Sequence, residues 1–336
     1  MGRMIVGFEG LTVPERVRRM ADAGLIAGVV LFTRNVASTA QWAALIAEID
    51  GLFPADGPPP IIAVDQEGGP VQRLKPPAIP EATTIPAMAS LARLDVAGDA
   101  GFEALGAALG AELRALGVNL DFAPVLDVDT NPDNPIIGQR AFGTTPADVI
   151  KRGLAFARGL EAAQIAWCAK HFPGHGDTLV DSHLALPRLP HTMARLDAIE
   201  LAPFAAAVRA GAPLIMTAHV VFEALDAVYP ATLSPHVVPT LLRQRFGYNG
   251  VVISDDLDML AIRDNYHVVE VARGLAQADI DIPLVCHDLD FAWALATTLL
   301  PSTTADARVA ALRRKLVRPR IAALPPFPEA LRARFS

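Results

Sequence analysis

The stretch IAWCAKHFPGHGDTLVDSHLALP, residues 165–187, is the part of the chain from which its fold is best inferred. It begins with the apolar run Ile165–Ala169, which is typical of a buried β-strand. It then changes to a polar run in which three histidines, two aspartates and a lysine lie between Lys170 and His183. Because a proline and two glycines interrupt this run, we expect a loop that leaves the end of a strand rather than a helix. Loops on a rigid scaffold commonly carry the chemistry of a protein.

The same theme, a short apolar run followed by an amphipathic helical stretch, repeats along the chain. The expected strands are Met4–Phe8, Gly28–Phe32, Ile61–Val64, Leu120–Leu126, Ile165–Ala169, Pro213–Met216, Val251–Ile253 and Ile280–Val285. The expected helices are Val13–Ala23, Ala40–Ile49, Gly101–Leu116, Pro146–Ala163, Ala198–Ala210, Pro235–Phe246, Val268–Ala276 and Asp290–Leu299. Apolar strands that alternate with helices indicate a parallel sheet covered on both faces. We therefore predict a single (β/α)8 TIM-type barrel over residues 1–336, in which Arg318–Ser336 forms a short C-terminal appendix.

Most of the expected strands end in a polar or ionisable cluster. These clusters are Thr33-Arg34-Asn35, Asp65-Gln66-Glu67, Asp127-Val128-Asp129, Lys170-His171, Thr217-Ala218-His219, Ser254-Asp255-Asp256 and His287-Asp288. In a parallel barrel the carboxyl ends of all strands lie on one face, where active sites are built. Strands also end where solvent begins, which would place polar residues there without any function. The high frequency of aspartate and histidine in these clusters favours a functional site at this end of the barrel, the barrel mouth.

Composition limits the classes of partner. The net charge of −7 argues against nucleic acid, because phosphate binding requires a basic face. Neither a membrane-spanning run nor a signal peptide is evident in the sequence, so we expect a cytoplasmic protein without a membrane partner. We also expect a monomer. The two cysteines, Cys168 and Cys286, lie in or beside apolar runs and are expected to be buried core residues rather than a disulfide.

The polar run after residue 169 has three interpretations. One is a metal site, for which the candidate ligands are His171, His175, Asp177, Asp181 and His183. Proline and glycine separate the first two histidines, so they cannot share a helix face as zinc-protease histidines do, and we predict no metal and no cofactor. The second interpretation is a structural loop. The third is a proton-transfer pair in which Asp181 or Asp177 orients a histidine, and the Asp-x-His spacing favours Asp181 with His183.

Two further segments place charged side chains near the expected mouth. Asp255 ends a buried strand and is expected to point into the barrel mouth, whereas Asp256 is expected to face a helix start or a neighbour. Arg140 lies in the loop after the fourth strand, where it would donate hydrogen bonds to sugar hydroxyls or to a carboxylate.

The run KHFPGHGDT, residues 170–178, followed by Asp181-Ser182-His183, resembles the signature of the β-N-acetylglucosaminidases of glycoside hydrolase family 3. Further segments match in the family's order: AVDQEGG at 63–69, DFAPVLDV at 121–128, IGQRAFG at 137–143, PATLS at 230–234 and SDDLDM at 254–259. The resemblance covers nearly the whole chain and is strongest to the compact bacterial enzymes of cell-wall recycling. Two departures are Pro70, where the family usually has arginine, and a loose match over Met259–Ile262.

The resemblance implies a retaining hydrolase that removes terminal β-linked N-acetylglucosamine, as from 1,6-anhydro-N-acetylmuramic acid in peptidoglycan recycling. It implies that Asp255 is the nucleophile and that Asp181 and His183 form the acid/base dyad. It also implies that Asp65, Arg140, Lys170 and His171 hold the sugar hydroxyls. A phosphorylase that uses the same residues, a metal-dependent hydrolase and a non-catalytic sugar-binding barrel are the alternatives.

Overall fold

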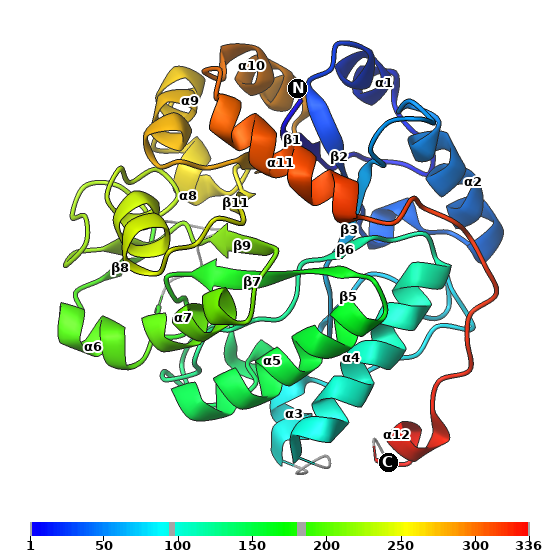
Figure 1. The fold of residues 1–336 in the computed structure, drawn as a ribbon, viewed down its shortest axis with the longest axis horizontal. Helices are drawn as coiled ribbons and strands as arrows, with labels where there is room; N and C mark the ends of the chain where they lie inside the picture. Colours follow the sequence, from blue (N-terminus) through cyan, green and yellow to red (C-terminus); the bar gives the residue numbers. More distant parts are fainter. Residues whose placement is uncertain (1, 94–97, 180–185, 335–336) are drawn as a thin grey trace.

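Within residues 2–93, 98–179 and 186–334, which the computed structural model describes, eight parallel strands form a closed barrel (Figure 1). Their order around the barrel is β1-β12-β11-β9-β7-β6-β3-β2. The strands are β1 Met4–Val6, β2 Ile26–Val30, β3 Ile61–Val64, β6 Leu120–Asp121, β7 Ala166–Phe172, β9 Leu214–Thr217, β11 Val251–Asp256 and β12 Ile282–Val285. Each overlaps one of the apolar runs, so the predicted (β/α)8 barrel is confirmed.

Helices lie outside the barrel (Figure 1), and each of the eight predicted stretches overlaps one of them, whereas the helix Thr303–Lys315 and several short helices lie outside the predicted stretches. The longer ones are α1 Glu15–Asp22, α2 Thr39–Asp50, α4 Gly98–Ala115, α5 Pro146–Ala162, α7 Leu201–Arg209, the π-helix Val237–Arg245, α9 Val268–Gln277, α10 Leu289–Thr298 and α11 Thr303–Lys315. The shorter ones are α3 Met88–Arg93, α6 Met193–Ala198, α8 Leu260–Arg263 and α12 Glu329–Arg332. The single helix expected over Ala198–Ala210 is wrong at its start. Ile199 leaves the helical region (φ −123°, ψ −71°), and this separates α6 from α7.

Several strand ends differ from expectation, and the differences at β6 and β7 shape the barrel mouth. The expected strand Leu120–Leu126 pairs only over Leu120–Asp121, after which Val125 forms a single bridge to Lys170. Pro124 has no backbone N–H to contribute to a continuous ladder. In contrast, β7 continues to Phe172, so Lys170 and His171 belong to the strand rather than to the loop. Pro173 follows directly, and the strand ends there.

The barrel interior is a separate apolar core. It is filled by inward-facing side chains from the strands, among them Ile5, Ile61, Leu120, Cys168, Leu214, Val251 and Ile282. Val309 and Leu312 of α11 pack into the same cluster. A larger cluster of apolar side chains lies between the strands and the surrounding helices. Both cysteines are buried and free, as expected.

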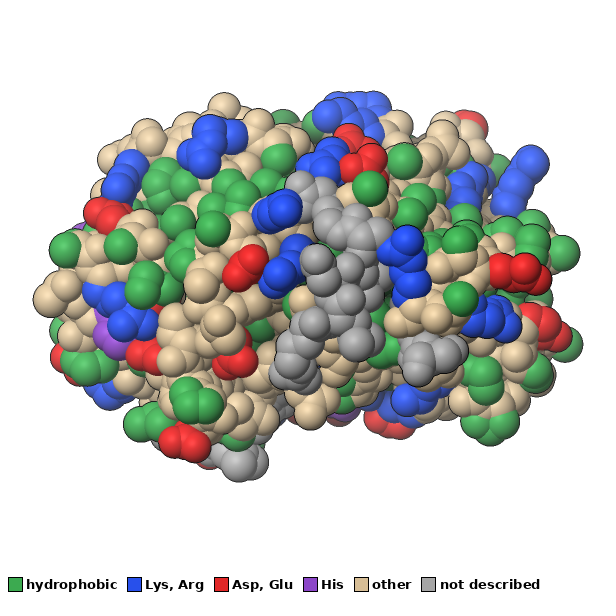
Figure 2. Space-filling model, turned by 90° about the horizontal axis from the view of Figure 1, so that it is seen from below, with side chains coloured by type: hydrophobic (Ala, Val, Ile, Leu, Met, Phe, Trp, Pro, Cys, Tyr) green, Lys and Arg blue, Asp and Glu red, His purple; other side chains and the backbone are tan. Residues whose placement is uncertain are grey.

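The exterior of the molecule carries side chains of mixed charge and polarity. Figure 2 shows one face, on which basic, acidic and apolar side chains are interspersed. In the described ranges, every helix is too short or too polar to cross a bilayer.

Candidate active site

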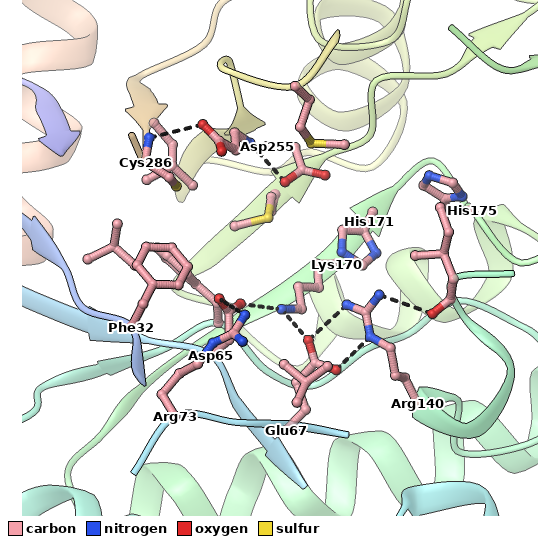
Figure 3. Close-up of a pocket in the computed structure, with 18 of the residues that line it drawn as sticks. Phe32, Asp65, Glu67, Arg73, Arg140, Lys170, His171, His175, Asp255 and Cys286 are labelled. Carbon is pink, nitrogen blue, oxygen red and sulfur yellow. Dashed lines mark hydrogen bonds and ion pairs between the residues drawn. The ribbon is translucent and has the colours of Figure 1, made fainter. Parts of the chain in front are cut away.

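A cavity of about 410 Å³ opens at the carboxyl ends of the barrel strands. Phe32, Asp65, Glu67, Arg73, Arg140, Lys170, His171, His175, Asp255, Asp256 and His287 are among the residues that line it (Figure 3). Asp65, Arg140, Lys170, His171 and Asp255, all singled out from the sequence, thus converge on one cavity. Lys170 and His171 lie in β7 and Asp255 in β11, Asp65 directly follows β3, and Arg140 lies in the long segment between β6 and α5. They come together because all strand ends meet on this face.

Lys170 lies at the centre of a chain of ion pairs on one side of the cavity (Figure 3). Its Nζ lies 2.8 Å from Asp65 Oδ1 and 2.5 Å from Glu67 Oε1. Arg140 forms a two-pronged pair with Glu67, with Nε donating to Oε2 at 2.8 Å and Nη2 donating to Oε1 at 2.9 Å. Arg73 Nη2 donates to Asp65 Oδ2 at 3.2 Å. Two carboxylates and three cations therefore form one rigid array of hydrogen-bond donors and acceptors.

The opposite charges in this array stabilise one another. Burial would raise the pKa of Asp65, but Lys170 and Arg73 outweigh burial and bring it well below its usual range. The pKa of Glu67 is likewise lowered, because Arg140 and Lys170 outweigh burial. In the opposite direction, the two carboxylates raise the pKa of Lys170 above its ordinary value despite its burial. All these groups are ionised at neutral pH, so the array can bind hydroxyl groups but is a poor source of protons.

The end of β7 is fixed by the buried carboxylate of Asp127. Its Oδ2 lies 2.7 Å from His171 Nδ1, and its Oδ1 accepts a hydrogen bond from the His175 amide at 2.7 Å. The carboxylate makes Nδ1 of His171 the donor, which orients the imidazole in the cavity wall. Burial and the neighbouring His171 lower the pKa of His175 to about 4, so His175 is neutral at physiological pH.

Asp255 lies across the cavity from the Lys170 array (Figure 3). Its Oδ1 accepts a hydrogen bond from the backbone N–H of Asp256 at 2.8 Å. Asp256 turns its own Oδ1 to the amides of Asp258 and Cys286, each at 3.0 Å. Burial, with Asp258 nearby, raises the pKa of Asp256 to about 7. Two adjacent aspartates therefore have different environments.

The expected dyad, Asp181 and His183, lies outside the described residues. Asp177, the other aspartate considered for orienting a histidine, accepts from Thr130 Oγ1 at 2.9 Å and pairs with His191 Nε2 at 2.6 Å. Within the described part of the chain, no group of three or more His, Cys, Asp or Glu side chains is arranged to hold a metal ion.

The sequence predicts no individual role for Glu67, Arg73 or Asp127, all of which contact residues of the site. Glu67 could have been found, because in an extended segment it points to the same side as Asp65. Arg73 follows the exposed Pro70 by three residues, and no sequence signal marks its contact with Asp65. Asp127 was noted at a strand end, but its contact with His171 depends on how two strands lie side by side. This chain has Pro70 where the family usually has arginine, and it has an arginine in the cavity wall three residues later, at Arg73.

Comparison with known proteins identifies the family. The family model described as the glycosyl hydrolase family 3 N-terminal domain matches residues 5–316. A beta-hexosaminidase of Methylococcus capsulatus is 43% identical over 77% of this chain and 75% of its own length. Beta-hexosaminidase A of Pseudoalteromonas piscicida is 38% identical over 82% of this chain, which spans 48% of that longer protein.

Solved structures agree with these sequence matches. A family 3 β-N-acetylglucosaminidase from a Paenibacillus species superposes with a TM-score of 0.89 at 37% identity, covering 98% of this chain and 66% of the other. NagZ of Neisseria gonorrhoeae, solved in complex with N-trifluoroacetyl-D-glucosamine, gives a TM-score of 0.82 at 33% identity, covering 99% and 93% of the two chains. With a sequence match over residues 5–316 and the barrel in common, the chain belongs to glycosyl hydrolase family 3.

Proposed function

We propose that the protein is a retaining exo-β-N-acetylglucosaminidase that removes terminal β-linked N-acetylglucosamine through a covalent glycosyl-enzyme on Asp255. The observation that carries this proposal is the placement of Asp255 across a 410 Å³ cavity from the ion-paired array of Asp65, Lys170 and its partners. The array would hold the sugar hydroxyls with charge-assisted hydrogen bonds. Asp255 would then face the anomeric carbon from the opposite side.

The charges in the cavity restrict where the acid/base can come from. A retaining glycosidase protonates the leaving oxygen from the side opposite its nucleophile. Asp65 and Glu67 are held ionised by cations, and His175, with a pKa of about 4, is neutral. Asp256 has a raised pKa but follows Asp255 on the same strand. The resemblance to family 3 implies a dyad of Asp181 and His183, and we propose that the proton comes from it, because a histidine can act first as acid and then as base near neutral pH.

The substrate class follows from the relatives. Relatives such as that of Methylococcus capsulatus are named beta-hexosaminidases, and NagZ of Neisseria gonorrhoeae was solved with an N-acylated glucosamine. We propose a role in peptidoglycan recycling, with N-acetylglucosamine released from anhydro-muropeptides in the cytoplasm. Cell fractionation with activity assays tests the location.

The decisive experiment is turnover of an aryl β-N-acetylglucosaminide, with and without phosphate and with and without a chelator. We expect free N-acetylglucosamine at the same rate in all conditions. We expect Asp255→Ala to abolish turnover, because the variant lacks the carboxylate on which the glycosyl-enzyme would form. The matched control is Asp264→Ala, at an exposed position, which should retain wild-type activity.

Other outcomes would identify the alternatives. A phosphate-dependent rate with a sugar 1-phosphate as product would make the protein a phosphorylase. Loss of activity with the chelator, restored by added metal, would indicate a metal-dependent hydrolase. Near-full activity of Asp255→Ala would refute the nucleophile assignment. Absence of turnover on every β-hexosaminide tested would favour a sugar-binding barrel.

A further inference from the structure

The backbone immediately after Asp255 sets the orientation of that side chain. Asp255 Oδ1 accepts a hydrogen bond from the Asp256 N–H at 2.8 Å (Figure 3). The position of this carboxylate oxygen therefore depends on how the backbone of Asp256 is held. A nucleophile must be aligned with the bond it attacks, and a displacement of about 1 Å can lower the rate on the order of 100-fold.

A buried histidine from the neighbouring strand holds this backbone. His219 follows β9 by two residues, is fully buried, and places Nε2 2.9 Å from the carbonyl oxygen of Asp256. A carbonyl oxygen can only accept, so Nε2 of His219 carries the hydrogen and donates it. The contact is a defined donor–acceptor pair between two strand ends of the barrel mouth.

The other ring nitrogen of His219 is also fixed. Nδ1 lies 2.8 Å from Thr232 Oγ1, which is itself 2.9 Å from Thr217 Oγ1 and 3.1 Å from the Ala218 carbonyl oxygen. His219, Thr217 and Thr232 are each 0% exposed. Fully buried polar groups are rarely left without partners, and here the hydroxyl network locks the imidazole plane.

From the other side, the fold holds the same short segment by contacts to β12. Asp256 Oδ1 accepts from the Cys286 amide at 3.0 Å, and the Leu257 amide donates to the Leu284 carbonyl at 2.9 Å. His219 supplies the matching contact on the β9 side. Unlike Asp256 and Leu257, His219 lies outside the segment after Asp255, so its side chain can be changed without changing that segment.

We propose that His219 is a positioning residue for catalysis, which aligns Asp255 by holding the carbonyl of Asp256 and is itself held by Thr232. This inference rests on the proposed function, in which Asp255 is the nucleophile. The sugar contacts proposed for Asp65, Lys170 and Arg140 lie across the cavity. Loss of the His219 contact should therefore lower kcat and leave KM nearly unchanged.

Two variants of His219 separate this role from simple packing. In His219→Gln the side-chain amide nitrogen reaches close to the position of Nε2, so it can still donate to Asp256. In His219→Asn the amide reaches only as far as Nδ1, so the donor to Asp256 is lost. We expect the Asn variant to lose about 10- to 100-fold in kcat, whereas the Gln variant retains most of it. The exposed His236, changed to Asn, is the control and should behave as wild type.

A second pair of variants tests the same chain of contacts without altering the histidine. Thr232→Val removes the hydroxyl at constant shape and should lower kcat, whereas Thr232→Ser keeps the hydroxyl and should not. Crystal structures of the His219 variants provide a readout that does not need activity. The Asn variant should lose the Asp255 Oδ1 to Asp256 N–H hydrogen bond, and the Gln variant should keep it.

The outcomes are distinguishable from failure of the proposed function. If the wild type does not hydrolyse β-N-acetylglucosaminides, the proposed function fails, and the crystal structures alone decide whether His219 positions Asp255. If the wild type is active, equal kcat for the Asn and Gln variants would overturn the inference. An unchanged Asp255 conformation in the Asn variant would also overturn it.

Discussion

At the scale of single residues, Asp255 and Asp256 show how one dipeptide carries two different carboxyl groups. Asp256 is the more deeply held of the two, with its Oδ1 bound to two backbone amides. Burial and the neighbouring Asp258 nevertheless raise its pKa to about 7. In the unfolded chain an aspartate titrates near pH 4. The folded protein therefore keeps a proton on Asp256 that the unfolded chain has already released at pH 5 or 6.

This difference makes the stability of the protein depend on pH in a specific direction. Between about pH 4 and 7 the folded state binds one proton more than the unfolded state at this site, so the free energy of unfolding falls as pH rises. Asp256→Asn mimics the protonated carboxyl and removes the effect. We expect the stability of Asp256→Asn relative to wild type to rise across this range by up to roughly 4 kcal/mol, and then to level off. Urea unfolding at several pH values measures it, and a pH-independent difference would contradict the assignment.

Residue identities in the site were partly accessible from sequence. Asp65, Lys170 and Asp255 each lie just after an apolar run expected to be a strand, and strand ends in a parallel barrel must share one face. The ion pairs among them were not accessible, because they depend on the distance between strands that are far apart in sequence. Arg73 illustrates this, since a short hairpin of β4 (Gln66–Gly68) and β5 (Val71–Gln72) returns it to Asp65.

At the scale of elements, α4 and α5 pack against each other with their backbones in close approach (Figure 1). A Cβ added to Gly159 of α5 would lie 2.1 Å from the carbonyl oxygen of Glu103 in α4. One added to Gly106 of α4 would lie 2.1 Å from the carbonyl oxygen of Phe156 in α5. Only glycine fits at these two positions, although glycine weakens an isolated helix.

Gly159→Ala therefore sets helix propensity against helix packing. Alanine in place of glycine favours an isolated helix by about 1 kcal/mol. We expect the clash with the α4 backbone to outweigh this, so that the variant is destabilised by about 1–3 kcal/mol, as is typical of overpacking. Gly51→Ala is the control, because its Cβ would lie an ordinary 3.4 Å from the nearest atom, so this variant should be neutral or slightly stabilised. A stabilised Gly159→Ala, measured by chemical denaturation, would show that the helices can move apart.

Most element positions followed from hydrophobic periodicity, but that of α11 and several element ends did not. The sequence predicts a loop from the polar pair Lys170-His171 onward, whereas β7 continues through both residues to Phe172. Its neighbours explain the difference: Lys170 is neutralised by Asp65 and Glu67, and His171 Nδ1 is hydrogen-bonded to Asp127 Oδ2. Polar residues can end a buried strand when the adjacent strand ends supply partners, and a single sequence does not show those partners.

At the scale of the whole molecule, α11 follows the last barrel strand in the sequence and packs against the apolar core inside the barrel. Val309 and Leu312 lie in the same core as the inward-facing strand residues, and Arg308 pairs with Asp281 at 3.0 Å. The family model also ends at residue 316, one residue after α11. These facts support the proposal that the chain is one domain from its first strand to this helix. The one-domain organisation and the monomeric state remain predictions.

If the barrel and α11 form one domain, they should unfold together. The tryptophans lie in α2 (Trp42), β7 (Trp167) and α10 (Trp293), so tryptophan fluorescence reports on separated parts of the barrel, and circular dichroism reports on all helices. We expect the two signals to change at the same denaturant concentration.

Leu312→Ala, at a side chain 6% exposed, should shift both transitions together by about 2–5 kcal/mol, because it leaves a cavity at the end of the barrel core. Leu300→Ala, at a side chain 52% exposed, should change stability by less than about 0.5 kcal/mol. Two separate transitions, only one of which moves with Leu312→Ala, would mean that α11 and its surroundings form an independent unit. A single cooperative core cannot lose part of its packing without weakening every strand that shares it.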